Sequence, residues 1–251
     1  MPTIGSFCLI KNEARFINRH IAEWLPFLDE MVFFDGGSTD GTLEILKQYA
    51  DTSPKIKLFE GKDPSDLQDD YVNLSNGAMW ALGTDLAIFL HPDMFPANGE
   101  TLRRLPDDLI AAAVEMESYA GDPGESIYRI EGRGSAWKTI YRLRNPNLGA
   151  HYHGHYGAHN EDTYFSEITG DKHEHYGTDF SKYPYPVNNS GLIIKHFSDV
   201  RPYARRLDRM IKCLINQGHS PKAAQEIAPQ HPRVSLKDGM GFKFIKSAEE
   251  I

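Results

Sequence analysis

The first ninety residues alternate short apolar runs with segments of helical periodicity, and this alternation restricts what the chain can fold into. Continuous apolar runs predict buried strands at Ile4–Ile10, Met31–Phe34, Ile56–Phe59 and Leu86–Leu90. Apolar spacings of three and four predict intervening helices at Glu13–Leu28, Thr42–Tyr49 and Leu74–Leu82. Strands and helices that alternate in this way predict an α/β fold with a parallel sheet covered on both faces.

Composition excludes several classes of protein. The chain has 251 residues, 11% of them aromatic, and a formal net charge of −8. It can therefore bury a large core, and binding to nucleic acid through bulk charge is not expected. Two cysteines, Cys8 and Cys213, are too few for a disulfide scaffold and indicate buried thiols in a reducing compartment.

The sequence contains no apolar run long enough to span a bilayer and no secretory signal at its N-terminus. We therefore expect a cytoplasmic protein without a transmembrane segment, and peripheral membrane contact stays open. The predicted helix Val200–Gln217 is rich in arginine. It predicts a solvated face or, as the alternative, contact with anionic lipid or an acidic partner.

Two polar clusters follow predicted strands directly. Asp35–Asp40 follows the second strand, and His91–Asp93 follows the strand Leu86–Leu90. In open α/β sheets, ligands bind beyond the carboxyl ends of the strands. The sequence therefore predicts a ligand site that combines the two clusters, with Asp40 capping the following helix.

The order of these polar motifs resembles the nucleotide-sugar half of family 2 glycosyltransferases, in the branch with a Lys-Asn-Glu start. The resemblance rests on motifs between residues 4 and 95, and recurs weakly at residues 141–145 and 196–198. These motifs are Lys11-Asn12-Glu13, Asp29-Glu30, Asp35–Thr42, Asn76-Gly77 and His91-Pro92-Asp93.

The resemblance implies a GT-A fold, in which a Rossmann-like, mostly parallel sheet has helices on both faces. Residues 1–115 would form the nucleotide-sugar-binding half and residues 116–199 the acceptor-binding half of the same domain. Residues 200–251 would form a C-terminal helical extension.

The resemblance also implies how the donor is bound. Asp35 would hydrogen-bond the nucleobase, which favours a UDP-linked sugar, and Asn12 and Glu13 would line the nucleotide pocket. Arg142 and Arg144 alternate with apolar neighbours, so they either stabilise the diphosphate or form salt bridges elsewhere.

A metal site is implied where the family carries an Asp-x-Asp motif. Asp93 occupies the last position of that motif and is the expected ligand for Mn²⁺ or Mg²⁺. His91 replaces the first Asp, and it could bind Mn²⁺ or hydrogen-bond the ribose or phosphate. His196 is a further candidate ligand, because a late histidine often completes the metal site in this fold.

Inverting transfer needs a carboxylate that takes the proton of the acceptor hydroxyl. Two acidic motifs in the second half could supply this base. Glu161-Asp162 follows His159-Asn160, and Glu174 lies between two histidines.

The sequence thus predicts a metal-assisted, inverting glycosyltransferase that moves a sugar from a nucleoside diphosphate sugar to a glycan or another hydroxyl acceptor. One alternative is a catalytically weak GT-A module that binds a sugar nucleotide or glycan, motivated by His91. A second is a nucleotidyltransferase on a related sheet. A third is a zinc hydrolase built on the alternating residues His151, His153 and His155.

Overall fold

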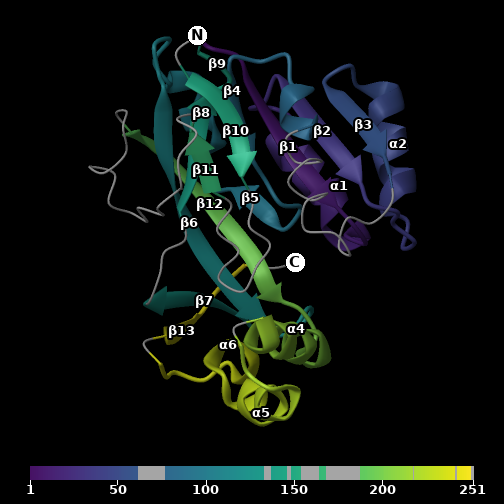
Figure 1. The fold of residues 1–251 in the computed structure, drawn as a ribbon, viewed down its shortest axis with the longest axis vertical. Coiled ribbons are helices and arrows are strands. Elements are labelled where there is room, and N and C mark those ends of the chain that lie inside the picture. The colour runs from purple at the N-terminus through teal and green to yellow at the C-terminus, as the bar shows by residue number, and fades with distance from the viewer. Residues whose placement is uncertain are drawn as a thin grey trace. The chain divides into compact units, whose positions relative to one another are not determined.

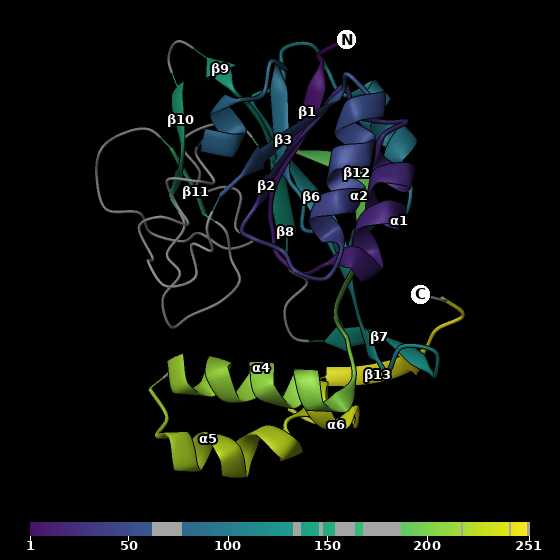
Figure 2. The same ribbon diagram turned by 90° about the vertical axis from the view of Figure 1, so that its right-hand side faces the viewer.

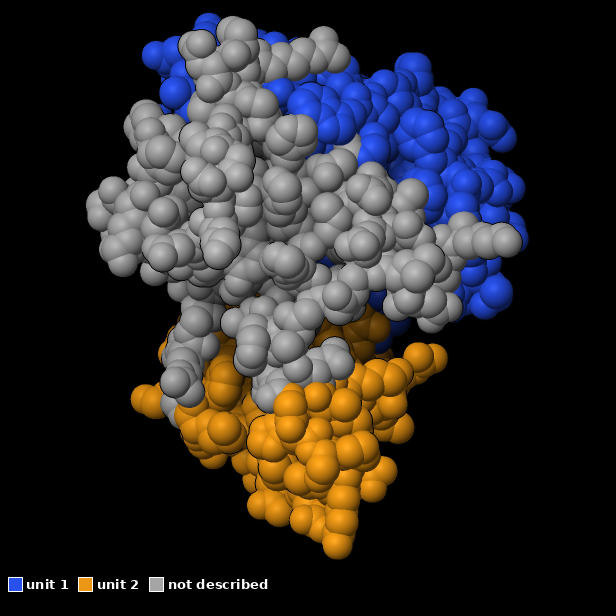
Figure 3. Space-filling model, viewed as in Figure 1, with its two compact units in different colours: residues 1–115, 137–155, 163–194 blue, residues 116–136, 156–162, 195–251 orange. Residues whose placement is uncertain are grey.

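A computed structural model of the chain contains two compact units (Figure 3). Unit 1 comprises residues 1–115, 137–155 and 163–194, and unit 2 comprises residues 116–136, 156–162 and 195–251. Residues 116–199 are divided between the two units, and the expected division into a nucleotide-sugar-binding and an acceptor-binding half stays a prediction. The structure describes residues 1–61, 77–132, 137–145, 148–153, 164–167, 187–216, 218–240 and 242–249.

Four parallel strands form the sheet of unit 1 that carries the predicted ligand site (Figures 1 and 2). In the order β4-β1-β2-β3, they are Leu86–Phe89, Ile4–Ile10, Glu30–Asp35 and Ile56–Glu60. All three neighbouring pairs are parallel. The predicted α/β alternation is therefore confirmed.

Antiparallel strands extend this sheet beyond β4. Strand β8 (Trp137–Arg142) pairs with β4, and the first half of β6 (Ala111–Gly121) pairs with β8. A short strand, β5 (Met94–Pro96), pairs with β12 (Val187–Val200). The sheet is thus parallel where the predicted ligand site lies and antiparallel further along.

Helices cover both faces of the parallel strands, as predicted. Helices α1 (Ala14–Trp24) and α2 (Thr42–Thr52) lie side by side on one face (Figure 2). A helical turn at residues 77–80 packs on the other face. Its apolar residues belong to a buried cluster with strand residues, and that cluster contains Phe7, Val32, Ala78, Met79, Leu82, Ala87, Phe89, Ala111 and Leu143.

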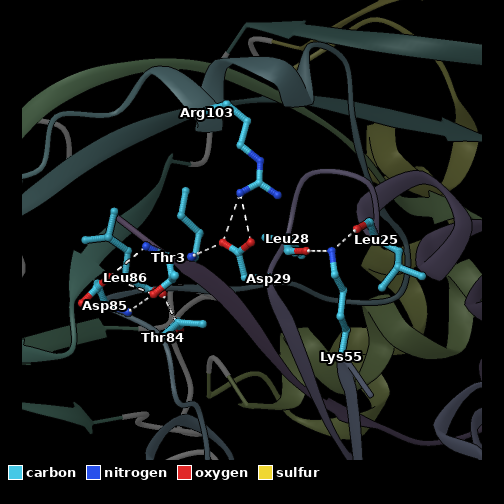
Figure 4. Close-up of polar contacts among 10 residues, drawn as sticks. Thr3, Leu25, Leu28, Asp29, Lys55, Thr84, Asp85, Leu86 and Arg103 are labelled. Atoms are coloured by element: carbon cyan, nitrogen blue, oxygen red, sulfur yellow. Dashed lines mark hydrogen bonds and ion pairs between the residues drawn. The ribbon is translucent and has the colours of Figure 1, made fainter. Parts of the chain in front are cut away.

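Charged side chains form hydrogen bonds and an ion pair at the end of the sheet where the parallel strands begin (Figure 4). Asp29 accepts a hydrogen bond from the Ile4 backbone N–H at 2.9 Å and pairs with Arg103 at 3.1 Å. Lys55 donates to the Leu28 carbonyl at 2.9 Å. Glu30, beside Asp29 in sequence, accepts from the Gly83 N–H at 2.5 Å. The Asp29-Glu30 motif therefore holds the amino ends of the strands together.

A separate small sheet in unit 1 contains β9 (Arg144–Asn145), β10 (Leu148–His153) and β11 (Tyr164–Glu167). All of its strand pairs are antiparallel. His151 and His153 lie in β10.

Unit 2 combines an antiparallel ribbon with helices. Strand β7 (Ile127–Gly132) pairs with the second half of β6 on one side and with β13 (Phe242–Lys246) on the other. The helical elements are α4 (Tyr203–Asn216), α5 (Pro221–Ile227), η4 (Ala228–Gln230) and α6 (Pro232–Ser235). Unit 1 also contains the helical element η2 (Gly99–Arg104).

Arg206 is a buried residue of unit 2, with 4% of its surface exposed. Its guanidinium donates to the Gly121 carbonyl at 2.6 Å and pairs with Asp122 at 3.0 Å. It also donates to the carbonyls of Arg201 and Val234. One side chain thus connects β6, α4 and α6, so the arginines of α4 do not all face solvent.

No helix among the described residues is both long and apolar enough to cross a membrane.

Replacing Arg206 by Met should lower the free energy of unfolding by about 3 kcal/mol or more, because buried acceptors lose their charged donor. Urea denaturation measures the change. The matched control is Arg205→Met, an exposed residue on the same helix, which should cost within about 0.5 kcal/mol. Equal losses in the two variants would contradict the central role of Arg206.

His231 should make the stability of unit 2 depend on pH. Burial and the nearby Arg233 lower the pKa of His231 below its ordinary value of 6.5, although Asp199 opposes them. Its Nδ1 also accepts a hydrogen bond from the Arg233 N–H at 3.3 Å. The unfolded chain therefore takes up the proton first, and stability present above pH 6.5 is lost as the pH falls toward the lower folded-state pKa.

His231→Asn keeps a side-chain acceptor at the start of α6 and removes the titrating group. Urea denaturation of both proteins between pH 8 and pH 5 (about the range over which histidine titrates) should show a shallower decline in the variant. Identical pH profiles would contradict the assignment.

Candidate functional site

The carboxyl ends of β1, β2 and β4 meet at one edge of the sheet. Ile10, the last residue of β1, pairs with Asp35, the last residue of β2. On the other side of β1, the Leu90 N–H donates to the Phe7 carbonyl at 3.2 Å. Phe89, the last residue of β4, pairs with Phe7, whereas Asp35 pairs with Ile10, three residues further along β1. Because neighbouring strands lie about 4.8 Å apart and each residue advances about 3.3 Å, the ends of β2 and β4 are separated by about 14 Å. Both polar clusters predicted from the sequence therefore start at this edge.

Asp35 organises its own loop. Its side chain is 1% exposed, and Oδ1 accepts hydrogen bonds from the N–H groups of Gly37 and Ser38 at 2.9 and 2.8 Å. Oδ2 accepts from the Ser38 hydroxyl at 2.6 Å. Three donors from the following turn thus bind this carboxylate, and its expected contact with a nucleobase stays a prediction.

Asn12 connects the loop after β1 to the loop after β2. Its Oδ1 accepts from the Thr39 N–H at 2.8 Å, and its backbone N–H donates to the Ser38 hydroxyl at 2.9 Å. Asn12 has a φ of 56°, a left-handed conformation that asparagine tolerates better than most residues. The Asn of the Lys-Asn-Glu motif therefore fixes the two loops relative to each other.

Asp40 caps two helices at once, which confirms and extends the predicted capping role. Oδ1 accepts from the N–H and hydroxyl of Thr42, the first residue of α2, at 3.1 and 2.5 Å. Oδ2 accepts from the N–H of Ala14, the first residue of α1, at 3.0 Å. Burial tends to raise the pKa of Asp40, but these hydrogen bonds outweigh it and lower the pKa below its ordinary value.

Glu13 takes part in the same network through its backbone. Its N–H donates to the Thr42 hydroxyl at 2.8 Å, and its carbonyl accepts from the N–H groups of Phe16 and Ile17 in the first turn of α1. The residues that form these hydrogen bonds within and between the two loops are called the donor-loop network below. They are Asn12, Glu13, Asp35, Ser38, Thr39, Asp40 and Thr42.

Asp93 and His91 lie beyond the end of β4. Asp93 is 5% exposed, while His91 is partly exposed and packs edge-on against the Phe89 ring, with centroids 4.6 Å apart. The Met94 N–H donates to the His91 carbonyl at 3.0 Å and closes a turn around Asp93. A nearly buried carboxylate is thus held in a tight turn, which suits it to a cation.

His20 and Trp24 reach this turn from α1, which the sequence did not predict. The His20 Nδ1 and the Trp24 Nε1 lie 3.0 and 2.8 Å from the Met94 carbonyl oxygen. Burial lowers the pKa of His20 to about 4, although the Met94 hydrogen bond and Asp93 act in the opposite direction. His20 is therefore neutral near pH 7. Both residues lie on the buried face of α1.

Arg142 lies at the other edge of the sheet, contrary to the expectation that it stabilises a diphosphate. It pairs with Leu86, the first residue of β4, whereas the candidate site follows the last. Its guanidinium donates to the Leu109 carbonyl at 2.7 Å and to the Asp107 carbonyl. Arg142 therefore holds a loop in place. Arg144 begins β9, and its side chain lies outside those the structure describes.

The remaining predicted site residues are distributed over the chain. His196 is 8% exposed and belongs to unit 2, whereas Asp93 belongs to unit 1. The candidate bases Glu161, Asp162 and Glu174 lie outside the described residues, as do Asn76 and His155.

The described residues are compatible with a metal held partly by substrate. No three His, Cys, Asp or Glu side chains in the described part of the chain come close enough together to hold a metal ion. Asp93, with or without His91, could supply one or two ligands. Mg²⁺ is commonly bound in this way, through one or two carboxylates plus substrate phosphates and water.

Asp40→Ala should lower the free energy of unfolding by about 1 kcal/mol or somewhat more, because two helices lose their cap. Asp40→Asn retains a side-chain carbonyl oxygen and should cost less. Thermal and urea denaturation compare the two variants. Equal destabilisation by both would show that the charge, rather than the capping geometry, stabilises the loops.

A solved mannosyltransferase structure has a similar fold. The mannosyltransferase PcManGT from Pyrobaculum calidifontis, solved in complex with GDP-Man and Mn²⁺, is 15% identical with a TM-score of 0.50. That match covers 94% of this chain and 70% of the mannosyltransferase chain. At this identity the likeness shows the fold alone, which is the expected GT-A fold.

Two further structures match with lower TM-scores. S. aureus TarS 1–349 is 18% identical, with a TM-score of 0.37, over 56% of this chain and 47% of that one. GalNAc-T7, solved with UDP, GalNAc and Mn²⁺, is 14% identical with a TM-score of 0.46. That match covers 92% of this chain and 48% of the GalNAc-T7 chain. This chain thus spans about half the length of these two proteins.

Comparison with models of protein families identifies the family of this chain. No curated protein sequence matches the chain significantly. The model of glycosyl transferase family 2 matches residues 9–158, a range that includes the loops after β1, β2 and β4. Because this match covers more than half of the 251 residues, the chain belongs to glycosyl transferase family 2.

Proposed function

We propose that this chain transfers a sugar from a nucleoside diphosphate sugar to an acceptor hydroxyl, with a divalent cation bound at Asp93. The observation that carries the proposal is the common sheet edge. A nearly buried carboxylate follows β4, and the donor-loop network follows the adjoining strands β1 and β2. A nucleotide and a cation can therefore be bound side by side in a chain of this family.

The donor-loop network would supply the nucleotide side of the site. Its acidic side chains are engaged with backbone N–H and hydroxyl groups of the same loops. Asp35 and Asn12 therefore act by fixing the loop surface against which a nucleotide can pack. This arrangement favours no particular base, and so the donor can be a uridine or a guanosine diphosphate sugar.

Asp93 would hold the cation, and His91 is placed to contribute a second ligand or a hydrogen bond to the donor. When bound, Mn²⁺ or Mg²⁺ supplies positive charge that stabilises the departing diphosphate. The turn closed by Met94 and His91 keeps the Asp93 carboxylate in place before the donor arrives. A preorganised ligand avoids paying for its ordering when donor and cation bind. His196 remains a proposed third ligand.

A carboxylate from the second half would take the acceptor proton. Glu161, Asp162 and Glu174 are the proposed candidates, and the transfer is proposed to be inverting. The acceptor is a glycan or another hydroxyl compound. Mutation of each candidate to its amide, with donor binding intact and transfer lost, identifies the base.

Asp93→Asn should abolish the part of nucleotide binding that depends on Mn²⁺. Thermal shift with UDP-, GDP- and CDP-sugars, with and without Mn²⁺, measures this in the wild type. A ligand at a hundredfold excess over its Kd adds about 2.7 kcal/mol to stability. Asp108→Asn, which changes an exposed carboxylate, is the matched control and should behave as the wild type.

A second assay distinguishes an enzyme from a protein that binds the sugar nucleotide without transferring the sugar. Release of nucleoside diphosphate from the donor that binds best, with water or added acceptors, reports catalysis. Loss of this release in Asp93→Asn supports an enzyme. Binding by the wild type without any release identifies a sugar-nucleotide-binding module, and no binding of any nucleotide contradicts the proposed function.

A further inference from the structure

We infer that His20 and Trp24 together position Asp93, by holding the carbonyl group of the next residue, Met94. The inference rests on the proposed function, because it assigns Asp93 to the cation. Neither side chain belongs to the loops at the carboxyl edge, and both come from the middle and end of α1. They are positioning residues, since they act on the site through the backbone.

The contact geometry is specific. The Trp24 Nε1–H donates to the Met94 carbonyl oxygen at 2.8 Å, and the His20 Nδ1 lies 3.0 Å from the same oxygen. Because a carbonyl can only accept, the His20 Nδ1 must carry the proton. His20 and Trp24 are four residues apart, which places them one above the other on a helix. One carbonyl thus receives two buried donors from a single helix face.

This contact lies in a region from which water is excluded. His20 and Trp24 are both 0% exposed, and Met94 is 1% exposed. The His20 ring packs edge-on against Phe33 of β2 and Phe95 of β5. A polar contact in such surroundings is costly to break, because the groups released find no water. The pair therefore restricts the Met94 carbonyl to one orientation.

The segment that contains Asp93 is restrained at both ends as well. Before it, the Leu90 N–H donates to the Phe7 carbonyl of β1. After it, the Ala97 N–H donates to the Ile193 carbonyl of β12 at 2.8 Å. Between these points, the contacts of His20 and Trp24 with Met94 join the turn to the helix layer. Without them, the Met94–Phe95 peptide, which begins one residue after Asp93, would be free to rotate and to shift the turn that carries the carboxylate.

Helix α1 also begins at the donor-loop network. Asp40 caps its first residue, Ala14, and the Glu13 carbonyl accepts two N–H groups of its first turn. A single helix of 11 residues therefore connects the loops after β1 and β2 to the turn after β4. We expect its length to set the separation between the nucleotide and the cation.

Three variants and a matched control test the inference. Trp24→Phe retains the aromatic ring and removes the donor, and His20→Leu removes the other donor. His20→Asn is the rescue variant, because its amide nitrogen can take the place of Nδ1. Ile17→Val is the matched control, since Ile17 is a fully buried residue of the same helix, and its substitution perturbs the core without removing a polar group.

The first measurement is the Kd of Mn²⁺ in the presence of saturating UDP or GDP, from the electron paramagnetic resonance of free Mn²⁺. Groups that orient a metal ligand typically change metal affinity by about 10- to 100-fold. We expect Trp24→Phe and His20→Leu to weaken Mn²⁺ binding about tenfold or more, within the same range. His20→Asn should recover most of the loss, and Ile17→Val should bind as the wild type.

The second measurement is hydrogen–deuterium exchange of peptides that cover residues 90–95 in the metal-free protein. Faster exchange in Trp24→Phe and His20→Leu than in Ile17→Val supports the positioning role. The Asp93 turn should become mobile while the remaining structure keeps its protection, which a general loss of stability would not produce.

The two proposals fail in different ways. If the wild type binds no Mn²⁺ with either nucleotide, the proposed function is wrong and the positioning role is wrong with it. If the wild type binds and Asp93→Asn does not, but Trp24→Phe and His20→Leu bind as tightly as the wild type, the inference alone is overturned.

Discussion

Parallel pairing of β1 with a strand on each side is the constraint on which the candidate site depends. It brings the carboxyl ends of β2 and β4 to the same edge, although Asp35 and His91 are far apart in sequence. Each strand is buried by helices, so its backbone polar groups must pair within the sheet. The side chains and loops that follow the strands are then the first groups free to meet a ligand.

Several acidic and amide side chains at this edge have a structural role, because they form hydrogen bonds that hold the loops and helix starts in place. Asp35 forms its turn, Asn12 joins two loops, and Asp40 caps two helices. Each satisfies backbone N–H groups that are otherwise left over where strands end and helices begin. The motif that resembles a family signature therefore largely builds a rigid pair of loops, and Asp93 is the carboxylate in this region that we propose as the cation ligand.

Sequence reasoning was least reliable for residues whose role depends on a distant partner. Arg142 was expected at the diphosphate, but pairing with Leu86 places it at the amino edge, where it binds backbone carbonyls. His20 and Trp24 lie on the buried face of α1, but their common acceptor, Met94, is about seventy residues away. Alternation and spacing predict which face a side chain occupies and carry no information about which atoms it meets there.

The sequence by itself determined the parallel α/β frame, the helix-capping role of Asp40 and the strand ends at which polar residues gather. These follow from local patterns, because burial on both faces requires continuous apolar strands and helix starts require particular capping groups. Only the tertiary structure decided that Asp35 is occupied by its own loop, that Arg142 lies at the opposite edge and that α1 holds the Asp93 turn. Such contacts depend on strand order and register, which join residues that no local pattern relates.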